Sequence, residues 1–216
     1  MSSFRVQGEV KRSVKSESKK AKKVFIIACE GSETEISYFR GIQDNKEELG
    51  ISNNVEVKPL EREGTRSHPT HVLADLKKYM RANGIKNDEL CMVIDRDPNN
   101  FFESQFDKIV EECKKHKYFL AITNPCFEFW LLLHFDISRY SHNQLLENVQ
   151  ISNKHSFISK ELSDKIRYSK NRLNFNKFMP YIDVAIENSK LFKLQNEEIK
   201  FQLGTSVGKL IEKIRD

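Results

Sequence analysis

Carboxylates follow two apolar runs of this chain, and their spacing suits the binding of a divalent cation. Asp95 and Asp97 come after the run 90–94, and Glu30 directly follows the run 24–29. In an extended chain, residues two apart point to the same side, so the two aspartates can grip one cation. Mg²⁺ takes one or two protein carboxylates and leaves its other positions to water and phosphate. The pattern predicts a metal site for phosphate chemistry; a turn rich in helix-capping acids is the alternative.

A further acid stands in an unusually apolar predicted helix, 127–135. Glu128 is near the start of this helix, where burial of a carboxylate is costly unless it is paired or bound to a metal. It could cap backbone amides or face the edge where the other acids gather. His134 is interpreted as a packed or capping residue rather than a metal ligand. Glu35 is interpreted as an acid that complements the dipole of the predicted helix 33–48.

These acids need a sheet edge to bring them together, and the remaining pattern predicts one. Strand and helix signals alternate along the first part of the chain, an order typical of a parallel sheet with right-handed crossovers. The strands are expected at 24–29, 55–60, 90–95 and 118–122, and the helices at 33–48, 70–83, 102–116 and 127–135. Ligands of such sheets lie beyond the carboxyl ends of the strands. Glu30 and Asp95 are therefore predicted to meet there.

The expected organisation has three parts. Residues 1–23 form a basic arm, and residues 24–136 form an α/β domain with a parallel four-stranded sheet flanked by helices. Residues 137–216 are richer in Glu, Lys, Asn and Ser, show no strong strand pattern and predict a helical extension packed on the sheet domain.

Basic residues concentrate in the arm. Residues 1–23 contain eight Lys or Arg and two Glu, and they carry the whole positive excess of a chain with a formal net charge of +5. Such arms often bind nucleic acid, and a solubilising tail is an equal alternative. Basic positions in the loop 61–69 and beside Tyr168 could contact phosphate or be ordinary solvated surface. The candidate nucleic-acid contacts are Lys19, Lys20, Lys22, Lys23, Arg66 and Lys170.

Composition excludes several classes of protein. No apolar stretch approaches the ~20 residues of a membrane-spanning helix, and the polar N-terminus has no signal-peptide core. The four cysteines are far apart without a Cys-x-x-Cys pair, and three of them lie in apolar runs, so these three are interpreted as small reduced core residues. The chain is expected to be cytoplasmic, with no membrane partner.

Three motifs resemble the RloB family, which includes the AbiL-type abortive-infection proteins. They are Glu-Gly-x-x-Thr-Glu-x-x-Tyr-Phe at 30–39, Asp-Arg-Asp at 95–97 and Asn-Pro-x-Phe-Glu-x-Trp-Leu-Leu-x-His at 124–134. The Thr-x-Val-x-x-Leu pattern at 205–210 adds a looser match. This family is similar to Toprim domains. The resemblance implies that Glu30 is a metal-linked general acid/base, and that Asp95 and Asp97 bind the metal.

The resemblance also implies a function. It suggests a Toprim-like nuclease that uses one or two Mg²⁺, with Mn²⁺ as a substitute, to hydrolyse phosphodiester bonds of RNA or DNA. Glu30, Asp95, Asp97 and Glu128 are its expected catalytic residues. A separate ATPase subunit and a role in antiphage defence are implied as well. The alternative is a non-catalytic regulatory or nucleic-acid-binding subunit of an ATPase-containing defence complex.

Overall fold

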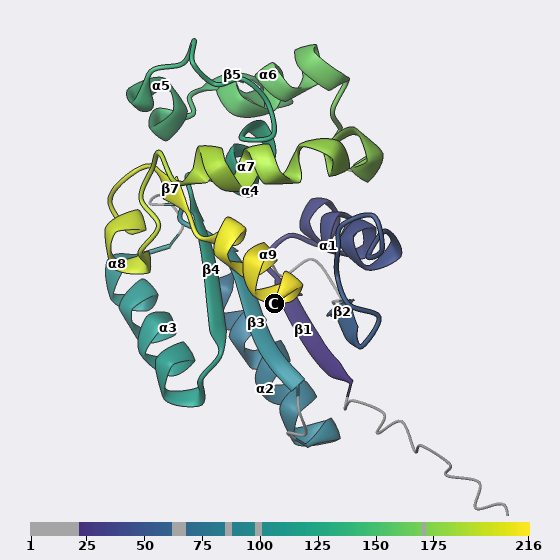
Figure 1. Ribbon diagram of the computed structural model, residues 1–216. Coiled ribbons are helices and arrows are strands. Elements are labelled where there is room, and N and C mark those ends of the chain that lie inside the picture. Colours follow the sequence, from purple (N-terminus) through teal and green to yellow (C-terminus); the bar gives the residue numbers. More distant parts are fainter. Residues whose placement is uncertain (1–21, 62–67, 85–87, 98–100, 170–171) are drawn as a thin grey trace, which may run out of the picture.

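The computed structural model describes residues 22–61, 68–84, 88–97, 101–169 and 172–216. Within these residues, a five-stranded sheet with the order β2-β1-β3-β4-β7 lies at the centre (Figure 1). Its strands are β1 (Lys23–Cys29), β2 (Val55–Pro59), β3 (Asp88–Asp95), β4 (Phe119–Asn124) and β7 (Gly204–Thr205). The first four are parallel, and β7 runs antiparallel to β4.

The prediction of a four-stranded parallel sheet is confirmed for β1 to β4 but wrong about the total. A fifth strand comes from the segment that was expected to be helical. Gly204 pairs with Asn124 and Thr205 with Thr123, and the two threonine hydroxyls lie 2.8 Å apart. Two residues are too few to show a strand pattern in sequence, and glycine is depleted in strands. The strand β7 therefore exists because β4 offers it a partner.

Helices cover both faces of the sheet. The helices of the first part are α1 (Thr34–Asp44), α2 (Pro69–Asn83), α3 (Glu103–His116) and α4 (Phe127–Leu132). Helix α1 and the C-terminal helix α9 (Val207–Arg215) cover one face, and α2 and α3 cover the other (Figure 1). Helix α4 begins at Phe127, as predicted, but ends at Leu132 rather than at residue 135, and a cis peptide bond joins Asn124 to Pro125 before it.

The segment after residue 136 is less purely helical than predicted. Its helices are α5 (His142–Glu147), α6 (Phe157–Ile166), α7 (Ile182–Ser189), α8 (Asn196–Ile199) and α9, with short 3-10 helices η1 (Phe175–Lys177) and η2 (Met179–Tyr181). Besides β7, it contains the small antiparallel pair β5 (Gln150–Ser152) and β6 (His155–Ser156). The strand β5 is exposed at all three residues, so no buried apolar pattern announces it.

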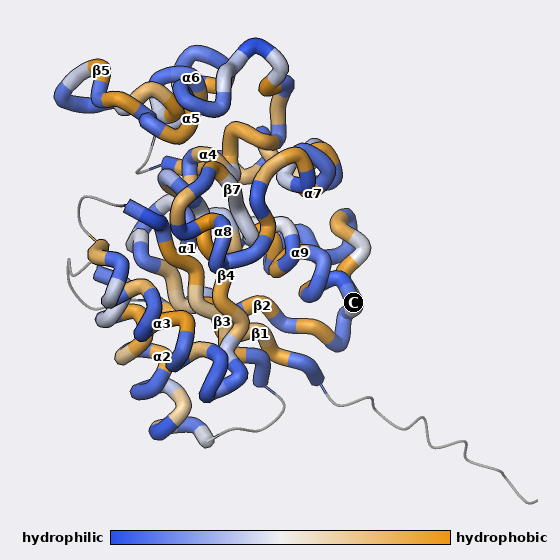
Figure 2. Tube along the Cα trace, turned by 90° about the vertical axis from the view of Figure 1, so that its left-hand side faces the viewer, coloured by the Kyte–Doolittle hydropathy of each residue, from blue (hydrophilic) through white to orange (hydrophobic). Residues whose placement is uncertain are grey.

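Successive residues of β1 point into two different cores. Phe25, Ile27 and Cys29 pack with α1, α4, α7 and α9, whereas Ile26 and Ala28 pack with α2 and α3. Because both faces are covered, the strand is apolar at nearly every position. Figure 2 shows hydrophobic segments along β1, β3 and β4 through the middle of the molecule.

The C-terminal helix is part of this packing. Helix α9 buries Val207, Leu210, Ile211 and Ile214 in the same core as alternate residues of β1 and β3. The segment beyond residue 136 therefore covers one face of the sheet rather than only touching its edge. No helix of the described residues has both the length and the apolar character that crossing a bilayer requires.

Candidate functional site

The strand order reverses between β1 and β3. Strand β1 leads through α1 to β2 on one side, whereas β3 leads through α3 to β4 on the other. Ligands of open α/β sheets bind beyond the carboxyl ends of the strands at such a reversal. Glu30 directly follows β1, and Asp95 is the last residue of β3. Both acids therefore stand at the position where this topology favours a ligand.

Hydrogen bonds join Glu30 to the end of β3. The Glu30 N–H donates to the Val93 carbonyl at 2.9 Å, and the Asp95 N–H donates to Glu30 Oε2 at 3.1 Å. The Glu30 side chain thus reaches across from β1 to β3. Glu30, Asp95 and Asp97 are all half-buried, so a ligand can approach them from the solvent.

Arg96 stands between the two aspartates and is buried, with an exposed fraction of 6%. Its Nε donates to the Lys200 carbonyl at 3.1 Å, and a terminal nitrogen donates to the Phe101 carbonyl at 2.7 Å. Burial lowers the pKa of the guanidinium, and Glu103, Asp97 and Asp107 oppose that shift. Arg96 thereby fastens the segment that carries the two aspartates to α3 and to the C-terminal segment. In the sequence, only its place between two acidic residues sets Arg96 apart.

Glu35 folds back onto the loop that follows β1. Its Oε1 accepts the Gly31 N–H at 3.1 Å, and the residue is 7% exposed. A Cβ on Gly31 would lie 2.0 Å from Glu35 Oε2, so only glycine allows this approach without a shift. The interpretation of Glu35 as a first-turn acid of α1 agrees with this position, and the loop amide is its partner.

Glu128 lies in a buried network on the α1 side of the sheet. It is 5% exposed in the first turn of α4, and the Tyr168 hydroxyl donates to its Oε1 at 3.1 Å. The same hydroxyl lies 3.2 Å from Thr34 Oγ1. Burial raises the pKa of Tyr168, and the Glu128 charge raises it further, followed by a smaller contribution from Glu35. Tyr168, from the C-terminal segment, was not assigned to the acidic site from the sequence.

The carboxylates at the strand ends are of the ligand type that a hard cation prefers. No group of three His, Cys, Asp or Glu side chains in the described parts of the chain is arranged to hold an ion by itself. Mg²⁺ needs no such cage, because it binds through one or two carboxylates and completes its shell with water and phosphate. Glu30, Asp95 and Asp97 are the carboxylates at hand for that role.

Comparison with known protein families shows the family of the chain. Residues 25–214 match the model of the RloB-like protein family. The chain belongs to the RloB-like family. The match includes all the carboxylates above and continues through Tyr168 and most of α9, so the C-terminal segment belongs to the same family unit as the sheet. No curated protein and no solved structure matches the chain.

His134 is a packing residue, in agreement with its interpretation from the sequence. It is 1% exposed; its Nδ1 lies 3.1 Å from the Trp130 carbonyl and its Nε2 lies 3.1 Å from the Tyr38 hydroxyl. Burial lowers the pKa of His134 to about 3, so the ring is neutral at pH 7. A neutral ring fits these contacts if Nδ1–H donates to the helix and Nε2 accepts from Tyr38.

Two of the basic residues predicted to contact nucleic acid, Lys22 and Lys23, are among the described residues, and both lie far from the acids. Lys22 forms an ion pair with Glu56, and Lys23 begins β1 with its Nζ 5.0 Å from the centre of the Phe25 ring. Glu30 stands at the other end of that strand, roughly 20 Å away at about 3.3 Å per residue. Lys19, Lys20, Arg66 and Lys170 lie outside the described residues.

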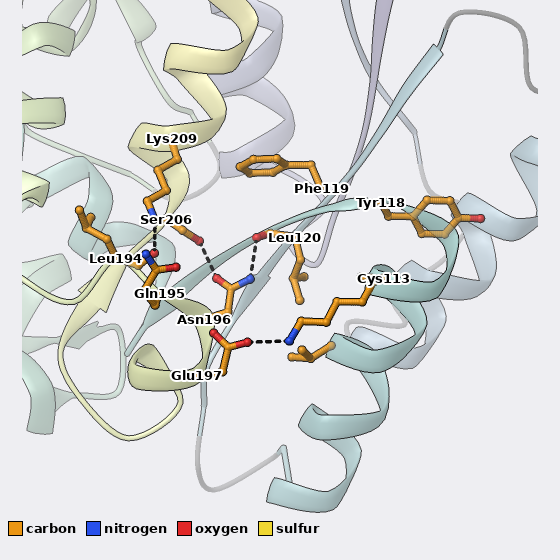
Figure 3. A pocket seen from close by; sticks show the side chains of 12 residues that line it. Cys113, Tyr118, Phe119, Leu120, Leu194, Gln195, Asn196, Glu197, Ser206 and Lys209 are labelled. Carbon is orange, nitrogen blue, oxygen red and sulfur yellow. Dashed lines mark hydrogen bonds and ion pairs between the residues drawn. The ribbon is translucent and has the colours of Figure 1, made fainter.

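A cavity of about 310 Å³ lies between α3, the start of β4 and the segment before α9 (Figure 3). The acids, in contrast, stand at the carboxyl ends of β1 and β3 and do not line it. Its polar groups bind one another. Lys114 pairs with Glu197, Lys209 donates to the Leu194 carbonyl, and Asn196 bonds to Ser206 and to β4. These contacts join α3 and β4 to the C-terminal segment, so the cavity belongs to the packing interface between them.

Proposed function

We propose that this RloB-like protein is a Toprim-like, Mg²⁺-dependent nuclease that hydrolyses phosphodiester bonds of RNA or DNA. Its proposed setting is antiphage defence by abortive infection, together with a separate ATPase subunit. Mn²⁺ is expected to substitute for Mg²⁺. Membership of the RloB-like family and the resemblance to abortive-infection proteins support this setting.

One observation carries the enzymatic part of the proposal. Glu30 and the end of β3 meet at the strand reversal, where the Asp95 N–H donates to Glu30 Oε2 at 3.1 Å. This contact brings a general-base candidate beside the first of two aspartates suited to a hard cation. An ordinary turn of helix-capping acids would not need a side chain that bridges two strands.

The proposed roles divide among the carboxylates. Asp95 and Asp97 would hold the cation, with Glu30 as a shared ligand and as the base that takes a proton from the attacking water. The water oxygen bonds to phosphorus as the bond to the leaving oxygen breaks, and that oxygen then gains a proton. When bound, Mg²⁺ supplies a more acidic water and stabilises the charge on the phosphate. Glu128 would support this geometry from α4.

Basic residues would supply the affinity for the phosphate backbone. Arg66 or Lys170 is proposed to neutralise the scissile phosphate. The arm residues Lys19, Lys20, Lys22 and Lys23 are proposed to add sequence-independent affinity that weakens with salt. Because Lys23 begins β1 at the end opposite Glu30, Lys23 itself would contact nucleic acid at some distance from the cut.

Isosteric variants test the proposal in cells that express the full chain with its partner ATPase. Glu30→Gln and Asp95→Asn keep side-chain shape and remove one charge each. Sequencing of RNA and DNA ends after induction should show site-specific ends for wild type and a loss of at least about 100-fold for either variant. Glu33→Gln removes an exposed carboxylate from the same loop and is the matched control, expected to cleave like wild type.

The same variants decide against the alternative, a non-catalytic regulatory or nucleic-acid-binding subunit. Circular dichroism and copurification with the ATPase establish that each variant folds and assembles. If assembled Glu30→Gln and Asp95→Asn complexes still produced wild-type ends and wild-type growth arrest, the chain would not be the nuclease.

A further inference from the structure

A second cavity, of about 290 Å³, opens between α5 and the segment that joins α7 to β7. Rings line much of it: His142 and Phe192 lie 5.0 Å apart between ring centres, and Phe201 stands at the rim with 61% of its surface exposed. Leu191, also of the lining, is 68% exposed, and Gln202 adds an amide. Large apolar side chains are thus open to solvent around a hollow that already contains aromatic rings.

This cavity is connected to the acidic strand ends through Arg96. The carbonyl that accepts the Arg96 Nε belongs to Lys200, and the next residue is Phe201. Arg96 itself stands between Asp95 and Asp97. The covalent path from Asp97 through the Arg96 side chain, with one hydrogen bond to Lys200, spans at most about 15 Å. A single strand bound at the proposed site of cleavage could therefore place a base at the Phe201 ring within a few nucleotides of the cut.

A second exposed ring follows the other residue whose carbonyl Arg96 binds. The other carbonyl held by Arg96 belongs to Phe101, and the following residue, Phe102, is 68% exposed. Phe101 is buried whereas Phe102 is exposed, so the two neighbouring rings point in different directions. Phe102 and Phe201 therefore each follow a residue whose carbonyl accepts a hydrogen bond from Arg96. Both rings are largely exposed, and Lys200 Nζ lies 5.0 Å from the centre of the Phe201 ring.

The charges around the rim favour a neutral flat group over a phosphate. Lys200 Nζ lies 2.7 Å from Asp107 and 2.8 Å from Glu103, and Lys193 Nζ lies 3.1 Å from Glu198. The cations near the cavity are thus already neutralised by carboxylates. A volume at the lower limit of small-molecule pockets suits one ring system. Nucleic-acid bases stack on exposed aromatic side chains largely irrespective of sequence.

We infer that the cavity rimmed by Phe201 receives an unpaired base of the strand whose phosphate would be bound by the proposed cation at Glu30 and Asp95. This inference rests on the proposed nuclease function and adds a substrate class to it. A base inside a duplex is already paired and stacked, so the pocket selects single-stranded RNA or DNA, or an unpaired loop.

Binding without cleavage tests the inference separately from the nuclease proposal. Fluorescein-labelled octathymidylate and octauridylate are titrated with the full chain in EDTA, beside abasic octamers and a blunt duplex, and anisotropy is measured. Phe201→Ala should weaken octamer binding about 5- to 150-fold, the range for loss of one stacked base. Phe201→Trp should restore it, and binding of the abasic octamer should not change. Tyr181→Ala removes another exposed ring, outside this cavity, and should bind like wild type.

Three results would overturn the inference: equal octamer binding by wild type and Phe201→Ala, equal loss of the abasic octamer, or a loss of ATPase-subunit binding alone, which would make the cavity a protein-docking surface. The two proposals fail differently. If octamer binding depends on Phe201 but no ends are produced in cells, the nuclease function fails and the base site stands. If ends are produced but Phe201 does not affect octamer binding, only the base site fails.

Discussion

Glu30 and Asp95 are half-buried and meet through a backbone amide, whereas Glu35 and Glu128 are almost wholly buried and accept bonds from a loop amide and a tyrosine hydroxyl. Both pairs stand near the same strand ends. They differ in what can reach them, because the first pair borders solvent and the second is enclosed by α1, α4 and Tyr168. A carboxylate kept from water must bind protein donors, or its burial would be costly.

This difference assigns the two pairs different tasks within the proposed function. The open pair can bind a cation and phosphate that arrive from solvent. The enclosed pair fixes the loop after β1 and the start of α4, so it determines where Glu30 is held. The C-terminal segment supports both pairs: Lys200 accepts a bond from Arg96 beside the open pair, and Tyr168 donates to Glu128 in the enclosed pair.

Loss of the Arg96 anchor should have the largest effect on the open pair. Arg96→Met keeps a buried side chain of similar length but leaves the Lys200 and Phe101 carbonyls without their donors. We expect the free energy of unfolding to fall by about 3 kcal/mol, since bonds from charged groups contribute about 1.5–3 kcal/mol each. Urea unfolding followed by circular dichroism measures it.

Arg139→Met is the matched control for that variant. Arg139 is 57% exposed and pairs with Glu161, so its loss should cost less than about 1 kcal/mol. Equal costs for the two variants would mean that Arg96 does not anchor the segment with the two aspartates.

Low pH should lower the stability of the folded protein through the buried His134. Its pKa is about 3 in the folded protein and 6.5 unperturbed, so the unfolded chain binds the proton more readily between these values. Stability from this residue is complete above pH 6.5 and is lost as the pH falls toward 3. From pH 7 to pH 5 the loss should be about 2 kcal/mol. His134→Gln should flatten the pH dependence of urea unfolding over this interval; an unchanged dependence would contradict the prediction.

The sheet could be predicted from the sequence because its strands are buried on both faces. The runs 24–29 and 90–95 are apolar at nearly every position, a pattern that few other elements share. The strand β7 could not be predicted, since its two residues become a strand only when Thr123 and Asn124 pair with them. The signal for β1 is local, whereas the signal for β7 lies about 80 residues away in the chain.

The acids of the site were found for a similar reason, and their supports were missed. Glu30 and Asp95 were identifiable because each ends an apolar run. Tyr168 lies in a polar stretch beside basic residues, where nothing nearby indicates that it turns inward to Glu128. The Lys200 carbonyl is a backbone atom, so no residue type could reveal that it accepts a bond from Arg96.

Removal of the Tyr168 hydroxyl should have a smaller effect, confined to the enclosed pair. Tyr168→Phe removes the hydroxyl that donates to Glu128 Oε1, at a site that is 5% exposed. The expected loss of unfolding free energy is about 1.5 kcal/mol. Tyr140→Phe, which removes a hydroxyl that donates to the partly exposed Glu161, is the matched control and should cost less. A larger loss in the control would show that enclosure is not what gives the Tyr168 bond its value.

The smallest expected effect is at Gly31, where the two pairs adjoin. Gly31→Ala would force the Glu35 carboxylate off the loop amide, because the new Cβ would lie 2.0 Å from Oε2. The loss of that bond should cost about 1 kcal/mol. In a Glu35→Ala background the same change should cost almost nothing, since the group that the Cβ meets is gone. Urea unfolding of all four proteins gives the coupling free energy. Equal costs of Gly31→Ala in both backgrounds would mean that the loop after β1 needs glycine for a reason other than Glu35.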